Sequence, residues 1–259
     1  MKVVETIVTH GYGALYFVDA AVGDFASAES LLGLDERPQV TFSPAVRGLL
    51  TTPKIGALAL SFEEGQTLAR TETLSIPDLP SPPARSALTL SGVVAGQSRR
   101  WLARAFAVTV SRGQRATLGL FRSPAGTQIG DGGALVARLG TDTGRPAPWC
   151  ILTLSVQIPP ETTLVCRAQS DAHGDVVLPL RRVPPLPKGV ADYAATLAVR
   201  WNPSATAELP VDPESFVAGQ LVPPDDATAQ PSVSLRVAPG QIGRLLSLNN
   251  NQQQLIVRP

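Results

Sequence analysis

The chain has 259 residues, of which 44% are hydrophobic and 17% are charged, and its formal net charge is +1. This composition supports a folded core and excludes an intrinsically disordered chain. The near-neutral charge gives no electrostatic footprint for nucleic acid or an anionic membrane, and no run approaches the roughly 20 apolar residues that span a bilayer.

Apolar and polar residues alternate with a period of two along most of the chain, which is typical of half-buried β-strands. In the clearest case, Cys150, Leu152 and Leu154 share one face with Val156, while Trp149, Ile151 and Thr153 take the other. In chain order, strands are expected at residues 3–9, 14–18, 55–62, 87–94, 104–111, 116–121, 150–158, 164–168, 194–201, 233–237 and 255–257.

Helical signals are sparse. Residues 27–33 fit one or two turns, with Ser27 as the N-cap and Gly33 as the terminating residue. The 24 prolines and 22 glycines suit many short strands joined by turns. We therefore expect an all-β fold of two or more antiparallel β-sandwich modules, Ig-like or transthyretin-like, joined by Pro-rich segments and holding at most one short helix.

Three Pro-rich stretches, residues 76–83, 183–187 and 202–231, are candidate joints between modules. The first is the best domain boundary, and the second also fits a loop inside a domain. The predicted division is an N-terminal β domain at 1–84, a central β-sandwich at 85–203, and a Pro-rich segment with a C-terminal β-hairpin at 204–259.

Residues 139–154, 166–180 and 193–199 resemble the carboxypeptidase-regulatory-like, transthyretin-like β-sandwich family. Its members run Gly-x-Pro before a strand, then Ser-Asp-Ala-x-Gly before a strand ending in Leu-Pro, then Tyr-x-Leu-x-Val. The core of the match is the turn at residues 170–175, and the usual Gly-x-Val at the start of the first strand is missing. The resemblance covers residues 139–201 and implies a non-catalytic module used for stability, adhesion or assembly.

The same turn holds the single cluster with metal-binding potential. Asp171, His173 and Asp175 alternate, so their side chains could face one way and bind a cation. A metal site generally needs a further ligand with ordered support around it, and the alternative is an Asx turn in which Asp171 bonds backbone amides. We favour the turn and predict no metal and no cofactor.

Other chemistry is missing from the sequence. There is no Gly-x-Ser-x-Gly elbow and no phosphate-binding Walker loop, so no catalytic residues are predicted and the chain is not expected to be an enzyme. Cys150 and Cys166 fall on inward faces and are interpreted as core thiols, with a disulfide between them as the alternative. A turn at 159–161 would set Cys150 opposite residue ~170, which disfavours the disulfide. Trp101, Trp149 and Trp201 are interpreted as core residues. The pairs at 99–100 and 181–182, all arginines, are interpreted as solvated strand ends rather than phosphate clamps.

These observations favour a structural or adaptor subunit of a large protein assembly, with a phage tail, baseplate or contractile-injection-type particle as the natural example. Its partners would be other protein subunits or further copies of this chain, bound through edge strands and the terminal segments 1–20 and 243–259. The alternative is a carbohydrate- or ligand-binding accessory module. Glu5, Thr6 and Thr9 interrupt any signal-peptide core, so synthesis in the cytoplasm and residence in a particle such as a virion or injection machine are expected.

Overall fold

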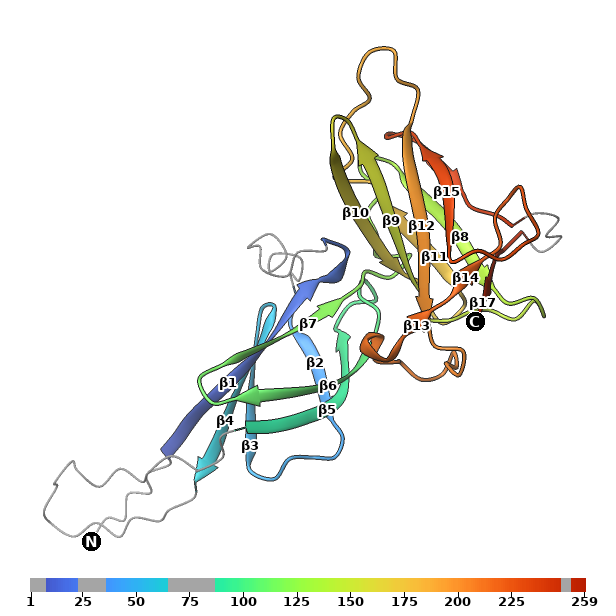
Figure 1. The fold of residues 1–259 in the computed structure, drawn as a ribbon. Coiled ribbons are helices and arrows are strands. Elements are labelled where there is room, and N and C mark those ends of the chain that lie inside the picture. Colours follow the sequence, from blue (N-terminus) through green and yellow to red (C-terminus); the bar gives the residue numbers. More distant parts are fainter. Residues whose placement is uncertain (1–7, 23–35, 65–86, 248–252) are drawn as a thin grey trace, which may run out of the picture.

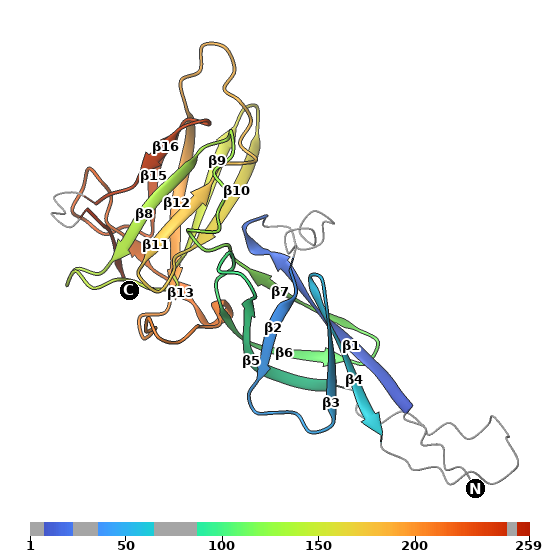
Figure 2. The same ribbon diagram turned by 180° about the vertical axis from the view of Figure 1, so that it is seen from behind.

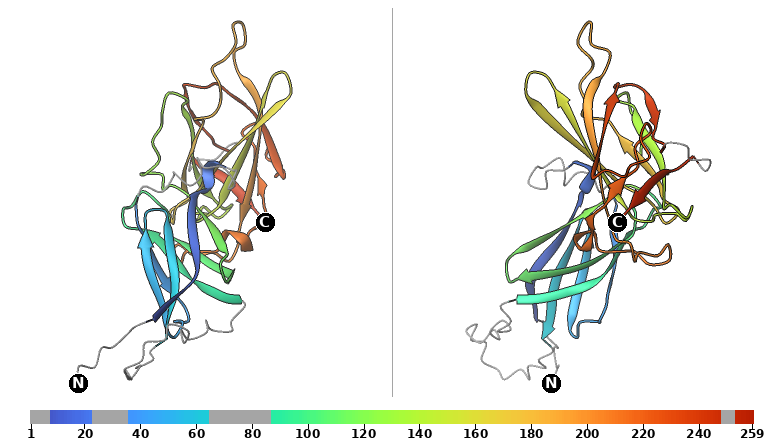
Figure 3. Two further views of the ribbon diagram at one scale, coloured as in Figure 1. Left: turned by 90° about the vertical axis from the view of Figure 1, so that its left-hand side faces the viewer. Right: turned by 45° about the vertical axis from the view of Figure 1, so that its right-hand side comes forward.

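The computed structural model describes residues 8–22, 36–64, 87–247 and 253–259. Within these residues the chain forms strands and two short 3₁₀-helices, which confirms the all-β fold class. The strands build several sheets gathered in two lobes (Figure 1). We call β1–β7 the N-terminal lobe and β8–β17 the C-terminal lobe. Figure 3 shows their end-to-end arrangement from two further directions.

The N-terminal lobe has two sheets, in the strand orders β3-β4-β1-β7 and β2-β5-β6. Its elements are β1 (Val8–Asp19), η1 (Ala20–Val22), β2 (Pro38–Phe42), β3 (Leu49–Lys54), β4 (Ala57–Glu64), β5 (Ala87–Gly96), β6 (Arg104–Ser111) and β7 (Arg115–Leu120). Strand β1 runs parallel to β7 and antiparallel to β4, while the remaining pairs of this lobe are antiparallel.

Both sheets of the N-terminal lobe contribute to one hydrophobic cluster that is rich in aromatic rings. Phe17 lies in it with Leu90 and Trp101. Tyr12 and Phe62 meet edge to face, with ring centroids 5.5 Å apart and an interplanar angle of 83°. This is the geometry that aromatic quadrupoles prefer, so the rings add orientation-dependent attraction to the burial of apolar surface.

The C-terminal lobe also has two sheets. One has the order β10-β9-β12-β13 with β15 added on β12, and the other has the order β11-β8-β17-β14 with β16 added on β8. Strands β16 and β17 run parallel to β8. The elements are β8 (Ala134–Gly140), β9 (Ile151–Ile158), β10 (Thr162–Gln169), β11 (Asp175–Pro179), β12 (Tyr193–Trp201), η2 (Pro213–Ser215), β13 (Val217–Ala218), β14 (Gln220–Leu221), β15 (Ser232–Val237), β16 (Ile242–Arg244) and β17 (Leu255–Arg258).

The alternation expected along β9 is confirmed on its inward face. Leu152, Leu154 and Val156 are fully buried in a cluster of mostly aliphatic side chains, which Cys150 and Cys166 also join. Ile151 belongs to the opposite face and is nevertheless buried. Its cover comes from the other lobe, so alternation within one strand did not predict it.

Most of the predicted strands are present with boundaries shifted by a few residues. Strands β2, β3, β8, β13, β14 and β16 lie where no strand was predicted, and β11 lies where only the family resemblance implied one. The predicted strand at 3–9 is described only from Val8, where it is continuous with the one predicted at 14–18 in β1. The predicted helix at 27–33 and the Pro-rich stretch at 76–83 lie outside the described residues. The second Pro-rich stretch, 183–187, is a loop between β11 and β12 inside one lobe.

Strand pairing does not follow the predicted division at residues 84 and 85. Strand β5 pairs with β2, and β7 pairs with β1, so strands on both sides of that position build the N-terminal lobe. The prediction was drawn from proline clustering, which marks a local change of direction but carries no information on which distant strands share a sheet. The change of lobe lies instead between β7 and β8 (Figure 2).

The predicted role of the terminal segments 1–20 and 243–259 as a binding surface also needs correction. Strand β1 lies inside its sheet between β4 and β7, and β17 lies between β8 and β14 rather than in a C-terminal hairpin. Side chains of both strands are buried in the cores, among them Leu15, Phe17, Leu255 and Val257. Deleting residues 1–20 or 243–259 would therefore destroy a sheet instead of testing a binding surface.

Candidate functional site

A third hydrophobic cluster joins the two lobes. Ala20, Leu102 and Phe121 come from the N-terminal lobe, and Trp149, Ile151 and Phe216 come from the C-terminal lobe. We call this set the junction cluster. It explains the burial of Ile151, since the N-terminal lobe covers the start of the outer face of β9.

Trp149 is held in place on two sides of the junction cluster. Its Nε1 donates to the Thr206 carbonyl oxygen at 2.8 Å, and its own carbonyl accepts from Gln169 Nε2 at 2.9 Å. Its backbone takes the left-handed conformation, with φ of 62°. A bulky residue rarely adopts this conformation, so the surrounding contacts must hold the residue there.

A largely buried ion pair fastens the lobes beside the junction cluster. Arg104, at the start of β6, donates through Nη1 to the Gly119 carbonyl at 2.7 Å and through Nη2 to Asp212 Oδ1 at 3.1 Å. Glu214 Oε1 lies 3.6 Å from the same Nη2. Asp212 also caps η2 by accepting from the Glu214 amide. The segment that follows β12, read in the sequence as irregular coverage or a linker, thus reaches across to the N-terminal lobe.

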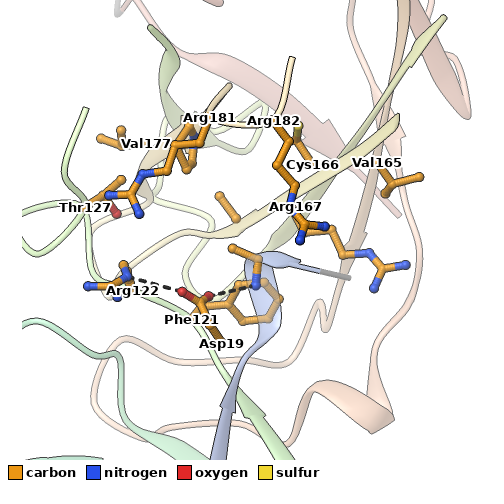
Figure 4. A pocket seen from close by; sticks show the side chains of 13 residues that line it. Asp19, Phe121, Arg122, Thr127, Val165, Cys166, Arg167, Val177, Arg181 and Arg182 are labelled. Atoms are coloured by element: carbon orange, nitrogen blue, oxygen red, sulfur yellow. Dashed lines mark hydrogen bonds and ion pairs between the residues drawn. The ribbon is translucent and has the colours of Figure 1, made fainter. Parts of the chain in front are cut away.

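A pocket opens next to this junction, between the end of β1 and strands β10 and β11 (Figure 4). Its volume is about 100 Å³. Apolar side chains from both lobes line it together with four arginines: Arg122, Arg167, Arg181 and Arg182. Ligand pockets for drug-sized molecules generally measure about 300–1,000 Å³, so this pocket suits only a small group.

The charged side chains of the pocket differ in the partners that they contact. Arg122 pairs with the buried Asp19 at 3.3 Å, and its guanidinium lies 4.5 Å from the centre of the Trp101 ring. Arg181 donates two hydrogen bonds to the Gln128 carbonyl, at 3.2 and 2.8 Å. Arg181 and Arg182 are exposed after β11, as predicted for solvated strand ends. No sequence pattern links them to Arg122 or Arg167.

The two cysteines are free and buried, as predicted. Ser170 donates its amide to the Cys150 carbonyl at 2.8 Å, and Cys166 pairs with Leu154, so the expected offset between the thiols is confirmed. Burial raises the pKa of the Cys150 thiol to about 12 and that of Cys166 to about 11. Both thiols stay protonated at neutral pH, which makes them poor nucleophiles.

Asp171, His173 and Asp175 form the turn between β10 and β11. Asp171 Oδ1 accepts from the amides of His173 and Asp175, at 2.8 and 3.0 Å, which confirms the Asx-turn interpretation. Asp175 faces Arg138 at 3.8 Å. In the described part of the chain, no three His, Cys, Asp or Glu side chains are placed to hold a metal ion. The turn therefore has a structural account that needs no metal.

The aromatic side chains are accounted for by packing. Trp101, Trp149 and Trp201 are 4%, 7% and 5% exposed, which confirms their interpretation as core residues. Across the residues whose burial is described, no Trp, Tyr or Phe is exposed. Stacking on sugars needs a fully open aromatic face, and in this part of the chain even Tyr16 and Phe42 are only partly exposed.

No helix among the described residues is long and apolar enough to cross a bilayer. Comparisons with protein-family models, with curated proteins and with solved structures find no match in any of the three. The candidate site therefore rests on the geometry of the junction alone.

Proposed function

We propose that this chain is a non-catalytic structural or adaptor subunit of a large protein assembly, such as a phage tail, baseplate or contractile-injection-type particle. It would consist of two β-sandwich modules, corresponding to the two lobes, with residues 139–201 related to the transthyretin-like family. Its partners would be other subunits of the particle or further copies of the chain. This function requires surfaces held at fixed positions, and it requires no reactive group.

The junction between the lobes is the observation that carries the proposal. A flexible linker would leave the lobes free to reorient, whereas here a buried cluster and the Arg104–Asp212 pair bridge them. A guanidinium that is removed from water must keep its partner, because an unpaired buried charge is costly. The fixed orientation suits a part that holds two neighbours at a set angle.

Each lobe also presents an exposed aliphatic side chain at an outer strand. Ile55 lies at the turn between β3 and β4 and is 72% exposed, and Ile242 begins β16 and is 63% exposed. Strand β3 is an edge strand, and Pro53 and Lys54 near its end limit pairing with another sheet. These positions replace the terminal segments as candidate contact sites, because their side chains are not part of the core.

The test is to tag the protein in its native host, isolate it gently, and examine the eluate by electron microscopy and mass spectrometry. The proposal expects a regular particle with stoichiometric partners. Ile55→Lys and Ile242→Lys should reduce incorporation while leaving the fold intact. The matched control is Leu209→Lys, whose side chain is equally exposed, at 67%, but lies in a loop away from any sheet edge. Recovery of the tagged wild-type protein only as a monomer or small oligomer would overturn the assembly proposal.

Ligand binding is the second candidate function, and the junction pocket is the observation that favours it. Its small volume and arginine lining point away from an oligosaccharide, and the buried aromatic side chains agree with this. A ligand there would be small and anionic.

A further inference from the structure

The strongest unexplained feature of the molecule is the concentration of positive charge in the junction pocket. Among the described residues that line it, four are arginines and Asp19 is the single carboxylate. Arg122 already engages that carboxylate at 3.3 Å. Like charges that share a partly buried space repel one another, and the repulsion is relieved when an anion lies between them.

Among these arginines, Arg167 is the one whose side chain has neither an ion-pair partner nor a hydrogen-bond partner in the described chain. The residue is nevertheless half-buried on β10. Its side chain lines the pocket and also a second cavity at the junction, beside Arg104 and Arg200. Arginine presents five donors in a rigid fork, so this unpaired guanidinium can bind an anion through two or more hydrogen bonds.

The size and lining of the pocket limit which ligand can accept hydrogen bonds from these arginines. A volume of about 100 Å³ holds a few water molecules or one small anionic group, but not a nucleotide or a sugar chain. The Thr127 hydroxyl already donates to the Ser123 carbonyl at 2.8 Å, which leaves the arginines as the main donors. Guanidinium groups bind the oxygens of phosphate and carboxylate in a two-point geometry.

We propose that the junction pocket binds a single oxyanion, a phosphate or carboxylate group, with Arg167 as its principal ligand and Arg181 and Arg182 at its entrance. The ligand would contact elements of both lobes and strengthen the junction when bound. The proposal stands independently of the assembly function.

The test measures the melting temperature of the full chain against increasing inorganic phosphate, with chloride holding the ionic strength constant. A saturable rise is expected, because a ligand that binds only the folded state stabilises it. Arg167→Gln should raise the half-saturating phosphate concentration at least about tenfold, the loss expected for one charge-assisted hydrogen-bonding group. The matched control is Arg112→Gln, which removes the same charge from an exposed turn outside the pocket.

Two further arms identify the chemical class of the anion and guard against misfolding of the Arg167→Gln variant. Acetate at the same ionic strength should reproduce the rise if the natural ligand is a carboxylate, whereas a response to phosphate alone assigns a phosphate. Arg167→Lys keeps the charge but loses the fork, and it should bind more weakly than wild type and more tightly than Arg167→Gln. Equal melting temperatures in phosphate, acetate and chloride would overturn the proposal. So would a phosphate response that survives in Arg167→Gln.

Discussion

The two lobes differ most clearly in the side chains that fill their cores. In the C-terminal lobe, β9 pairs with the neighbouring β10, and the core is mostly aliphatic. In the N-terminal lobe, Ala14 of β1 pairs with Arg115 of β7, and Pro38 of β2 pairs with Gly96 of β5. The core there is rich in aromatic rings. Both lobes combine hairpins, such as β3–β4 and β9–β10, with pairs of strands that lie far apart in the chain, such as β1–β7 and β8–β17. Both lobes must therefore close long loops before those contacts form.

The tryptophans make this comparison measurable. Trp101 lies in the core of the N-terminal lobe, Trp149 in the junction cluster, and Trp201 in the core of the C-terminal lobe. Replacing each with Phe in turn would assign the fluorescence of each region. The unfolding of the lobes and of the junction can then be followed separately.

The largest expected effects come from removing core side chains. Phe17→Ala should destabilise the N-terminal lobe by about 3–5 kcal/mol, and Leu154→Ala the C-terminal lobe by about 2–5 kcal/mol, since each leaves a cavity in a fully buried site. Each lobe has its own core, so each variant should shift mainly its own tryptophan signal during urea unfolding. Coincident shifts of both signals in both variants would show that the lobes unfold as one unit.

Two glycines test how much the turns of the C-terminal lobe contribute to its stability. Both have positive φ, +81° at Gly174 and +87° at Gly189, but an added Cβ at Gly174 would collide with the Leu139 carbonyl, while Gly189 has open space. Gly189→Ala should cost about 1 kcal/mol from backbone strain alone, and Gly174→Ala about 3 kcal/mol. Urea midpoints provide the measurement. Equal losses would mean that the turn at Gly174 can relax.

The junction should respond to loss of its ion pair. Asp212→Asn keeps a cap for η2 but removes the nearer of the two carboxylates beside Arg104. We expect a loss of about 2 kcal/mol, below the value for a fully buried pair, because Asp212 is 23% exposed and Glu214 remains 3.6 Å from Arg104. The Trp149 signal should report the loss. The control is Asp192→Asn, whose partner Arg236 is 70% exposed, and it should cost at most about 1 kcal/mol. Similar effects of both variants would argue that the Arg104 pair does not fasten the lobes.

The smallest effects concern the two thiols. At pH 8 iodoacetamide should label both slowly, and Cys166 faster than Cys150, because its pKa is about 11 rather than about 12 and it lines the junction pocket. Both rates should rise about tenfold per pH unit up to pH 10, following the thiolate fraction. Mass spectrometry of digested protein measures the two sites. Faster labelling of Cys150 would contradict the burial order.

The same pKa values predict how the free energy of unfolding changes with pH. An unfolded thiol titrates near 9.0, whereas the folded thiols hold their protons to about 11 and 12. The unfolded state therefore binds fewer protons above pH 9, and stability should fall as pH rises from 9 towards 11. Replacing Cys150 with Ala should make this slope shallower in urea titrations.

The sequence by itself determined the all-β class, most strands, the inward cysteines, the buried tryptophans and the Asx turn at Asp171. Each follows from short-range physics, namely side-chain alternation, turn chemistry and the burial of apolar rings. Tertiary structure decided the rest. Which strands share a sheet, why Ile151 is buried, and why Arg167 and Arg122 line one pocket depend on segments far apart in the chain. No local pattern records those encounters, because they are set by how two cores pack against each other.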